Sequence, residues 1–293
     1  LAEGGIVAVK GLGGYHLACD ATSSEAVSRL RARKRRGDKP FAILVRDVAC
    51  ARLLWEVSEQ AEALLVSNRR PIVVLPRRED GNKTVVQQVA PGNPDLGVML
   101  PPTALHHLLL GLKGDAQGPV ALVLTSGNLA GDPIVTDDRE AVDRLAGIAD
   151  AWLRHDRAIH IPCDDSVTRV VDSVELPIRR SRGYAPVPVA LPFDVGPTMA
   201  LGGDLKNTIA VAHGRYVWLS AHIGDMDDLA TQHAFAKATI HLTDLTGVRP
   251  DRLVCDLHPG YRSTRWAERA VAESVPLTTS HCAPSLVRVQ HHH

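Results

Sequence analysis

The sequence predicts a mixed α/β protein built in two parts. Apolar runs of strand length alternate with stretches of helical patterning, which is typical of an α/β fold with a mixed sheet. A proline-rich run interrupts this alternation about two thirds of the way along the 293 residues. Hydrophobic residues make up 45% of the chain, which is enough for a core in each part. We therefore expect domains over 1–185 and 199–293, joined by a linker over 186–198.

The first part should form a sheet of buried strands with helices packed on it. Thr22 and Glu25 have the spacing of a capping box and would start a helix that runs toward Arg35. Further helices are expected over 58–66 and 137–146. Strands are expected where aliphatic and β-branched residues cluster, over 6–9, 41–45, 72–75, 120–125 and 167–171.

The second part begins after prolines that disfavour both helix and sheet. A short strand from Met199 should end in a Gly-Gly turn, and a hairpin is expected around His213-Gly214-Arg215, with strands over 208–212 and 216–220. Beyond it we expect a helix over 228–245 that stops at Gly247, a strand over 253–257, a helix over 263–273 and a strand over 286–290. This order is that of the opening of an actin-like ATPase fold.

Composition excludes several classes of protein. Lys+Arg and Asp+Glu number 33 each, which argues against bulk electrostatic binding to nucleic acid or to a membrane surface. The five cysteines are widely spaced without a C-x-x-C pair, so we expect reduced thiols in a cytoplasmic protein. No signal peptide and no apolar run of membrane-spanning length is visible. The chain opens almost inside a predicted strand and ends in three histidines, so we expect a fragment of a longer protein.

A basic run is the most distinctive local feature. Seven of the eleven residues from Arg29 to Lys39 are basic, and the predicted strand over 41–45 follows directly. Cations held beside a sheet suit a polyanion such as ATP, whereas the alternative is a solvated helix face. Lys34, Arg36 and Lys39 could bind phosphates or a carboxylate from a loop after the helix, and the alternative is that they only solubilise the surface. The arginines of the preceding helix are expected to be solvated, and they are Arg29, Arg31 and Arg33.

Polar side chains also follow several predicted strands. Asp164 and Asp165 could hold magnesium, although neighbouring side chains on an extended chain point apart. Thr125, Ser126 and Asn128 end an apolar strand, where α/β proteins place ligands, but the same pattern fits an ordinary turn or helix cap. The remaining candidates are Lys10 before a glycine turn, Ser166, Arg180, the turn residues Gly203, Asp204, Lys206 and Asn207, and His291 as a metal ligand or the start of a purification tag.

Longer motifs in both parts resemble one family. KGLGGYHLACDA, LTSGNLAGDPI, HDRAIHIPCDDSVTRV and PIRRSRGYAP are similar to the YrdC/Sua5-like domain of HypF-type carbamoyltransferases. LGGDLKNTIAV, LSAHIGDMDD and CDLHPGYRSTRWA resemble the start of the Kae1-like domain of the same proteins. The resemblance implies a YrdC/Sua5-like α/β domain followed by the first part of an actin-like, Kae1-like domain. It also favours His291 as the first ligand of an HxxxH motif over a tag.

The resemblance implies a two-step chemistry. The first domain would join ATP with carbamate, derived from carbamoyl phosphate, as carbamoyl-adenylate and release pyrophosphate. The Kae1-like domain would pass the carbamoyl group to the C-terminal cysteine of a HypE-type protein, for the cyanide ligand of NiFe-hydrogenase. Mg²⁺ would accompany ATP, and Fe or Zn would bind the complete Kae1-like domain. The implied catalytic residues are Lys34 and Arg36, and the implied nucleotide-binding residues are Lys10, Lys39, Thr125, Ser126, Asn128, Ser166, Arg180, Gly203, Asp204, Lys206 and Asn207.

One departure and two alternatives remain. Where the family has K-G-R-P, this chain has Lys34-Arg35-Arg36-Gly37, which adds a cation and removes the proline. A YrdC/Sua5-type threonylcarbamoyl-adenylate synthase or an RNA-binding module in tRNA modification is the first alternative, although zero net charge counts against RNA. The second is a fragment that docks a HypE-type protein without catalysis.

Overall fold

The computed structural model describes all residues except 79–83, 113, 116–117, 130–131, 274–283 and 291–293. The chain folds as two compact units. The first unit consists of Leu1–Ala130 and Ile134–Gly183, and the second of Gly131–Pro133 and Tyr184–His293. Each unit buries its own hydrophobic core, as separately folding domains do.

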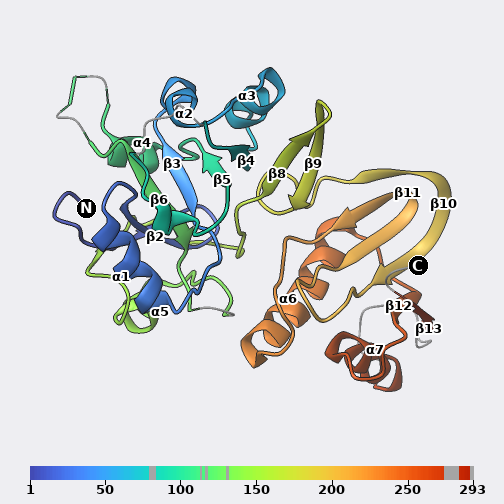
Figure 1. Cartoon of the computed structure of the whole chain (residues 1–293). Helices are drawn as coiled ribbons and strands as arrows, with labels where there is room; N and C mark the ends of the chain where they lie inside the picture. The colour runs from blue at the N-terminus through green and yellow to red at the C-terminus, as the bar shows by residue number, and fades with distance from the viewer. Residues whose placement is uncertain (79–83, 113, 116–117, 130–131, 274–283, 291–293) are drawn as a thin grey trace. The chain divides into compact units, whose positions relative to one another are not determined.

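In the described part of the first unit, nine strands form one mixed sheet (Figure 1). Their order is β7-β1-β2-β6-β3-β5-β4-β8-β9. β3 pairs with β5, β4 with β8 and β1 with β7 in parallel, and the other neighbours are antiparallel. The expected mixed sheet is therefore confirmed. The strands are β1 Val7–Lys10, β2 Tyr15–Asp20, β3 Ala42–Val45, β4 Ile72–Pro76, β5 Asp95–Met99, β6 Ala121–Ser126, β7 Ala151–Leu153, β8 Val167–Val171 and β9 Val174–Arg179.

Both faces of the middle of this sheet are buried. Leu17, Ile43 and Val123 pack with Leu30 of helix α1 on one face. Leu44, Leu122 and Leu124 pack with Leu110 of helix α4 on the other face. Burial on both faces explains why these strands read as continuous apolar runs. The helices are α1 Ser24–Lys34, α2 Val48–Leu54, α3 Glu59–Val66, α4 Ala104–Leu110 and α5 Asp138–Leu145, with a 3-10 turn at Gln87–Val89.

Helix α1 begins one residue later than the predicted capping box. Ser23, not Thr22, is the N-cap, and its hydroxyl accepts the backbone N–H of Ala26 at 3.2 Å. The backbone N–H and hydroxyl of Thr22 both bind Oδ1 of Asp20 at 2.8 Å. Because the Thr22 hydroxyl is bound to Asp20, it does not cap the helix, and the hydroxyl of the next residue, Ser23, is the N-cap.

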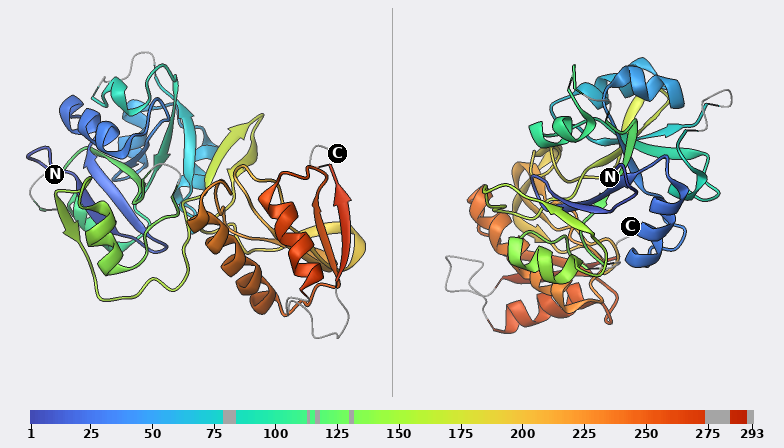
Figure 2. Two further views of the ribbon diagram at one scale, coloured as in Figure 1. Left: turned by 90° about the horizontal axis from the view of Figure 1, so that it is seen from below. Right: turned by 90° about the vertical axis from the view of Figure 1, so that its left-hand side faces the viewer.

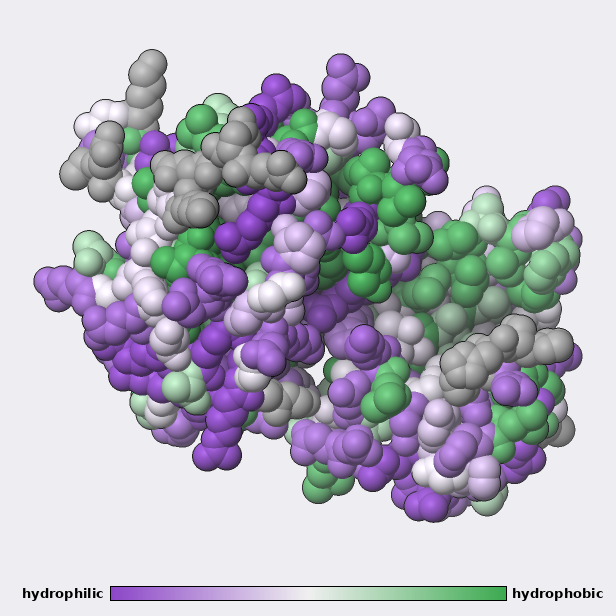
Figure 3. Space-filling view, in the orientation of Figure 1, coloured by the Kyte–Doolittle hydropathy of each residue, from purple (hydrophilic) through white to green (hydrophobic). Residues whose placement is uncertain are grey.

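The β8–β9 hairpin at one edge of the sheet is apolar on its exposed side. Val174, Leu176 and Ile178 are 67%, 52% and 59% exposed. Figure 3 shows hydrophobic side chains gathered over this hairpin. The edge thus differs from the buried middle of the sheet.

In the described part of the second unit, four strands form a sheet in the order β11-β10-β12-β13. β10 runs antiparallel to β11 and parallel to β12. Helices α6 and α7 lie side by side next to this sheet (Figure 2), and α6 ends at Gly247 with φ 69°, as predicted. The elements are β10 Val189–Ala200, β11 Ala210–Leu219, α6 Leu229–Thr246, β12 Arg252–Asp256, α7 Arg262–Ala272 and β13 Ser285–Val289.

Two predictions for this region are wrong. Most of the run predicted as a linker is strand β10, which begins at Val189 and accommodates its prolines where the pairing with β11 shifts register, between Ala190 and Val195 and between Val195 and Thr198. Proline lacks an N–H, so such irregular positions tolerate it. The predicted hairpin around Gly214 is instead one strand, because β10 pairs along the whole of β11 and Gly214, at φ 58°, sits opposite Val195.

Candidate functional site

Lys34 is the last residue of α1 and is only 1% exposed. Its Nζ donates to the backbone oxygens of Ser126 and Asn128, both at 2.6 Å, and to Oδ1 of Asn128 at 2.7 Å. The Ser126 hydroxyl donates to the same Oδ1 at 2.8 Å. An ammonium has three N–H donors, and residues 126–128, the SGN loop, offer an acceptor for each. The structure thus joins three predicted site residues and shows Lys34 holding the SGN loop.

Arg36 is held against Phe41, just after α1. Its guanidinium carbon lies 4.8 Å from the centre of the Phe41 ring, and that of Arg31 lies 4.7 Å from it. Arg36 also donates to the backbone oxygens of Lys39 at 3.2 Å and Pro40 at 2.7 Å. Burial, then the charges of Arg31 and Arg179, lowers the pKa of Arg36 to about 10, so it remains a cation at neutral pH. The segment from 36 to 40 is therefore a pinned basic loop.

The arginines earlier on α1 are not simply solvated, contrary to the prediction. Arg29 donates to the backbone oxygen of Gly4, and Arg31 donates to the backbone oxygens of Gly37 and Val89. Arg33 pairs with Asp150 at 2.6 Å. Guanidinium groups present several donors in a fixed plane, which suits such bridges between segments. These cations tie α1 to neighbouring segments.

Asp165 lies at the centre of a buried polar network that the sequence analysis missed. Its Oδ1 accepts from Arg182 Nη2 at 2.7 Å and Nε at 3.1 Å, and its Oδ2 lies 3.1 Å from His16 Nε2. Burial opposes ionisation, but the hydrogen bonds and charges of His16 and Arg182 outweigh it and hold the pKa of the Asp165 carboxyl well below its usual range. A histidine inside an apolar strand and two aspartates before the next strand were the available signals.

His106 of α4 extends this network. Its ring makes an edge contact with His16, with centroids 5.8 Å apart, and its Nδ1 lies 2.7 Å from the Thr103 hydroxyl. Burial, then the nearby His16 ring, lowers the pKa of His106 to about 3, so the ring is neutral at physiological pH. Within the described residues, His16 Nδ1 and His106 Nε2 are buried without a hydrogen-bond partner.

The two candidate magnesium carboxylates do not converge. Asp164 faces Arg179, with a shortest N–O distance of 3.5 Å, while Asp165 is engaged by Arg182 and His16. The described residues contain no group of three or more His, Cys, Asp or Glu that could hold a metal ion. Within the described residues, Asp164 and Asp165 therefore do not form a shared carboxylate site.

The other predicted residues of the first unit have structural partners. Lys10 is 2% exposed and pairs with Asp138 at 2.7 Å, which also accepts from the Tyr15 hydroxyl at 2.7 Å. Ser166 accepts the backbone N–H of Ser181 at 2.7 Å and donates to the backbone oxygen of Arg182. Neither contacts the SGN loop through these bonds. Thr125 is 7% exposed in β6, Lys39 is exposed, and Arg180 is partly buried beside the end of β9.

The glycine turn of the second unit is organised by its own polar side chains. Asn207 Nδ2 donates to the backbone oxygens of Leu201 at 2.8 Å and Gly203 at 2.6 Å. Asp204 accepts the backbone N–H groups of Arg262 at 2.9 Å and Ser263 at 3.1 Å, which cap α7. Lys206 is exposed, with φ 49°. The structure thus brings Gly203, Asp204 and Asn207 together at the N-terminus of α7.

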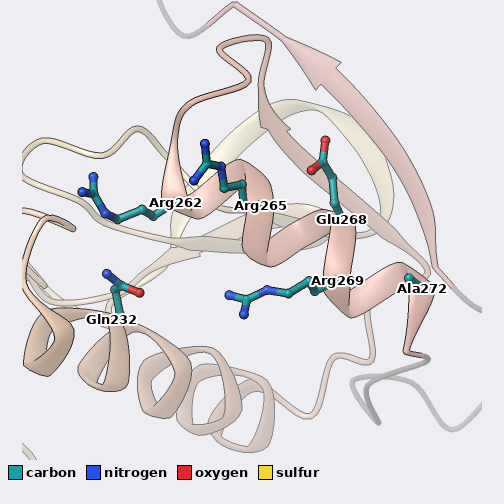
Figure 4. A pocket seen from close by; sticks show the side chains of 6 residues that line it. All are labelled: Gln232, Arg262, Arg265, Glu268, Arg269 and Ala272. Carbon is teal, nitrogen blue, oxygen red and sulfur yellow. The ribbon is translucent and has the colours of Figure 1, made fainter.

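A cationic groove extends from this turn between α6 and α7. It encloses about 650 Å³ and is lined by Gln232 and four polar residues of α7 (Figure 4). Arg262 also pairs with Asp227 at 2.6 Å, and Glu268 pairs with Arg288 at 2.8 Å. Arginine side chains thus line the α7 wall. The four polar residues of that wall are Arg262, Arg265, Glu268 and Arg269.

His291 lies outside the described residues. Of the cysteines, those described are free thiols, namely Cys19, Cys50, Cys163 and Cys255. Within the described residues, no helix combines the length and apolarity needed to cross a membrane.

Comparison with known proteins links this architecture to two family models. The Sua5/YciO/YrdC model, described as telomere recombination, matches residues 1–181, and the HypF Kae1-like domain model matches residues 194–293. Carbamoyltransferase HypF2 of Cupriavidus necator is 44% identical over 308 residues, and carbamoyltransferase HypF of Rhodobacter capsulatus is 45% identical over 297 residues. Each match covers 100% of this chain and 37% of the relative. The chain therefore spans little more than a third of these relatives.

Solved structures give the same pattern. A crystal structure of full-length HypF in the phosphate- and nucleotide-bound form matches with a TM-score of 0.89 and 39% identity, covering 100% of this chain and 43% of that chain. The crystal structure of P. abyssi Sua5 complexed with L-threonine matches with a TM-score of 0.53 and 20% identity over 63% of this chain and 52% of that chain. The second likeness shows a shared fold alone.

Proposed function

The chain belongs to the HypF carbamoyltransferase family, and we propose on that basis that its first unit joins ATP and carbamate as carbamoyl-adenylate. In this step a carbamate oxygen attacks the α-phosphorus of ATP, a phosphorus–oxygen bond to the β-phosphate breaks, and pyrophosphate leaves. The carbamate forms beforehand when water hydrolyses carbamoyl phosphate, which releases inorganic phosphate. No protein nucleophile is required, so the site must bind, orient and neutralise charge.

The Lys34–SGN loop contact is the observation that carries this proposal. It fixes Ser126 and Asn128 at the C-terminal end of β6, next to the end of α1. The pinned basic loop beyond α1 supplies Arg36 and Lys39 for the phosphates. Lys34 acts by holding the SGN loop in place, and Arg36 is the cation we assign to the triphosphate. The nucleotide-bound HypF structure, 39% identical to this chain, supports ATP as the ligand.

The second step is assigned to the Kae1-like part. We propose that the complete protein transfers the carbamoyl group to the C-terminal thiol of a HypE-type protein in the cytoplasm. We assign nucleotide binding to the Gly203–Asn207 turn itself, because Asp204 already accepts the backbone N–H groups of Arg262 and Ser263 at the start of α7. Asp204 fixes this helix end and Asn207 fixes the turn. We propose the transfer for a full-length protein of this family and the adenylate step for the residues of this chain, which span 37% of the relatives it matches.

Isotope exchange tests the first step. The whole chain is incubated with ATP, labelled pyrophosphate and Mg²⁺, with and without carbamate. We expect label in ATP only when carbamate is present, and we expect Arg36→Ala to reduce the exchange by about 100-fold or more. Exchange that responds to L-threonine and bicarbonate instead would assign the chain to threonylcarbamoyl-adenylate synthesis. ATP binding without exchange in either mixture would overturn the proposed reaction.

A further inference from the structure

The cationic groove between α6 and α7 contains two arginines that no carboxylate neutralises. Arg262, at one end of the groove, pairs with Asp227 at 2.6 Å. Arg265 and Arg269 also line the groove and are exposed, and within the described residues neither forms an ion pair. In Figure 4 the side chain of Arg269 extends along the space between the two helices. Two guanidinium groups are therefore available to an anionic ligand.

The spacing of these two arginines is unfavourable when nothing is bound to them. They lie four residues apart on α7, so their charges share one face of the helix, and like charges at this spacing destabilise a helix. The carboxylate between them in the sequence does not relieve the repulsion, because Glu268 is bound to Arg288 of β13 at 2.8 Å. An anionic ligand that contacts both arginines would remove this repulsion.

A second, mainly apolar cavity continues the groove along α7. It encloses about 260 Å³, and Arg269 lines both cavities. Trp266 forms part of its wall, and the Trp266 ring contacts Phe235 of α6 edge to face, with centroids 5.3 Å apart. Ile240 of α6 also lines this cavity and is 58% exposed. A ligand that fills both cavities therefore carries anionic groups beside an apolar group.

Neither a second copy of this chain nor a nucleic acid complements this groove. In a symmetric dimer formed through the groove, Arg265 and Arg269 of one copy would approach the same arginines of the other, and like charges brought together oppose association. A nucleic acid presents a continuous row of phosphates. Acidic side chains on the same two cavities would repel such a row, and they are Glu268 and Glu273.

We propose that this groove docks an acidic amphipathic helix of a partner protein. Residues four apart on a helix lie on one face, about 6 Å apart along its axis. Two carboxylates at that spacing match Arg265 and Arg269, which have the same spacing. An apolar side chain on the same face of the partner helix fills the cavity beside Trp266 and Ile240. The assignment goes beyond the proposed adenylate chemistry and does not depend on it, because every residue that carries it belongs to the second unit.

Peptide binding to the whole chain tests the assignment. The probe is a fluorescein-labelled, alanine-rich helical peptide of about 18 residues, with two glutamates one turn apart and two leucines on the same face. A matched peptide carries glutamine in place of both glutamates. By fluorescence anisotropy we expect a Kd of about 10–100 μM for the acidic peptide, and binding at least about tenfold weaker for the glutamine peptide.

Single substitutions then locate the binding surface. Arg269→Glu should raise the Kd of the acidic peptide by about tenfold or more, because it replaces an attraction with a repulsion. Ile240→Ser should raise it by about threefold, since it removes part of the apolar wall. Lys237→Glu is the matched control, because Lys237 is exposed on α6 and lines neither cavity. It makes the same change of charge and should alter the Kd by less than about twofold.

Four outcomes would overturn the assignment. They are the absence of acidic-peptide binding, equal binding of the two peptides, equal effects of Arg269→Glu and Lys237→Glu, and tighter binding of a single-stranded uridine oligonucleotide of about 20 nucleotides that Arg269→Glu abolishes. The last would assign the groove to nucleic acid instead. If Arg269→Glu fails to fold, as judged by its thermal unfolding, Arg265→Glu decides. Pyrophosphate exchange reports on the first unit, so its presence or absence leaves this test unaffected.

Discussion

The ammonium of Lys34 lies 2.7 Å from Oδ1 of Asn128, 94 residues further along the chain. This contact connects the end of α1 to the SGN loop after β6. Hydrogen bonds to a buried charged group are worth more than neutral ones, and they fix geometry as well. The role of Lys34 in the proposed reaction is therefore to place Ser126 and Asn128.

The Lys34–Asn128 contact predicts strong coupling in a double-mutant cycle. Lys34→Met leaves the loop acceptors without their cation, so we expect it to lower the free energy of unfolding by about 2–3 kcal/mol. Asn128→Ala should also destabilise, and the double variant should lose about 1 kcal/mol less than the sum. Urea unfolding followed by circular dichroism measures all three. Additive losses would contradict the contact.

Arg35 predicts a stabilising substitution. It occupies the C-cap of α1 with φ 52° and ψ 44°, a left-handed conformation that costs a side-chain-bearing residue about 1 kcal/mol. Arg35→Gly should raise the free energy of unfolding by about 0.5–1 kcal/mol. Arg35→Ala is the control, since it removes the exposed side chain but keeps the strained backbone, and it should give no such gain. An equal gain in the free energy of unfolding for Arg35→Gly and Arg35→Ala would show that the gain comes from removing the Arg35 side chain and not from relieving its left-handed backbone.

The fold was predictable where burial of one or both faces of a strand or helix dictates which residues it contains. The apolar runs placed β3, β6 and β8 to within a residue, and Asp228 and Gly247 marked the ends of α6. Strand β2 was missed, because the glycines before it suggested a turn. The predicted linker was wrong, because the prolines of β10 fall where its pairing is irregular.

The site was predictable as residue types but not as contacts. Lys34, Ser126 and Asn128 stood out by sequence, and their meeting depends on tertiary packing across 94 residues. Arg31 and Arg33 looked like solvated helix residues because only their distant partners, Val89 and Asp150, show otherwise. Local patterns carry no such information.

His106 predicts a pH dependence of stability. Its pKa is lowered from 6.5 to about 3 in the folded chain, chiefly by burial. The unfolded chain therefore binds a proton below about pH 6.5 that the folded chain refuses. The stability that comes from keeping His106 neutral is fully present above pH 6.5. As pH falls below that value, the free energy of unfolding decreases by up to about 1.4 kcal/mol per pH unit.

His106→Gln should remove this dependence. Chemical unfolding of the two proteins between pH 5 and 8 would measure the difference, since carboxylates common to both cancel. We expect the free-energy gap between wild type and variant to narrow as pH falls from 6.5 to 5. A gap that stays constant over this window would show that His106 takes up a proton as readily in the folded chain as in the unfolded chain.

Phe41 predicts a link between packing and nucleotide affinity. Its ring is 1% exposed and lies under the guanidinium groups of both Arg31 and Arg36. Phe41→Leu keeps an apolar side chain but removes both cation–π contacts, each worth about 0.5–1 kcal/mol. We expect the Kd for ATP to rise about three- to tenfold by calorimetry. An unchanged Kd would show that the basic loop does not contribute to nucleotide binding.

The contacts of Asp204 predict how much of the stability of the second unit depends on the cap at the start of α7. Its carboxylate accepts the backbone N–H groups of Arg262 and Ser263 at the start of α7, and Arg262 Nη1 lies 3.4 Å from it. Asp204 is 7% exposed, so Asp204→Ala leaves those N–H groups without a partner at a nearly buried position. We therefore expect the free energy of unfolding to fall by about 2 kcal/mol.

Asp204→Asn separates the cap from the charge. The amide oxygen can still accept one helix N–H group, whereas the attraction to the helix dipole and to Arg262 is lost. We therefore expect a smaller loss of about 1 kcal/mol, and we expect Arg262→Ala, which leaves both backbone bonds in place, to cost less again. Hydrogen exchange at the amides of Arg262 and Ser263 would read the cap directly. Equal protection in Asp204→Ala and the wild type would show that Asp204 does not hold the start of α7, and that the turn and the helix are fixed independently.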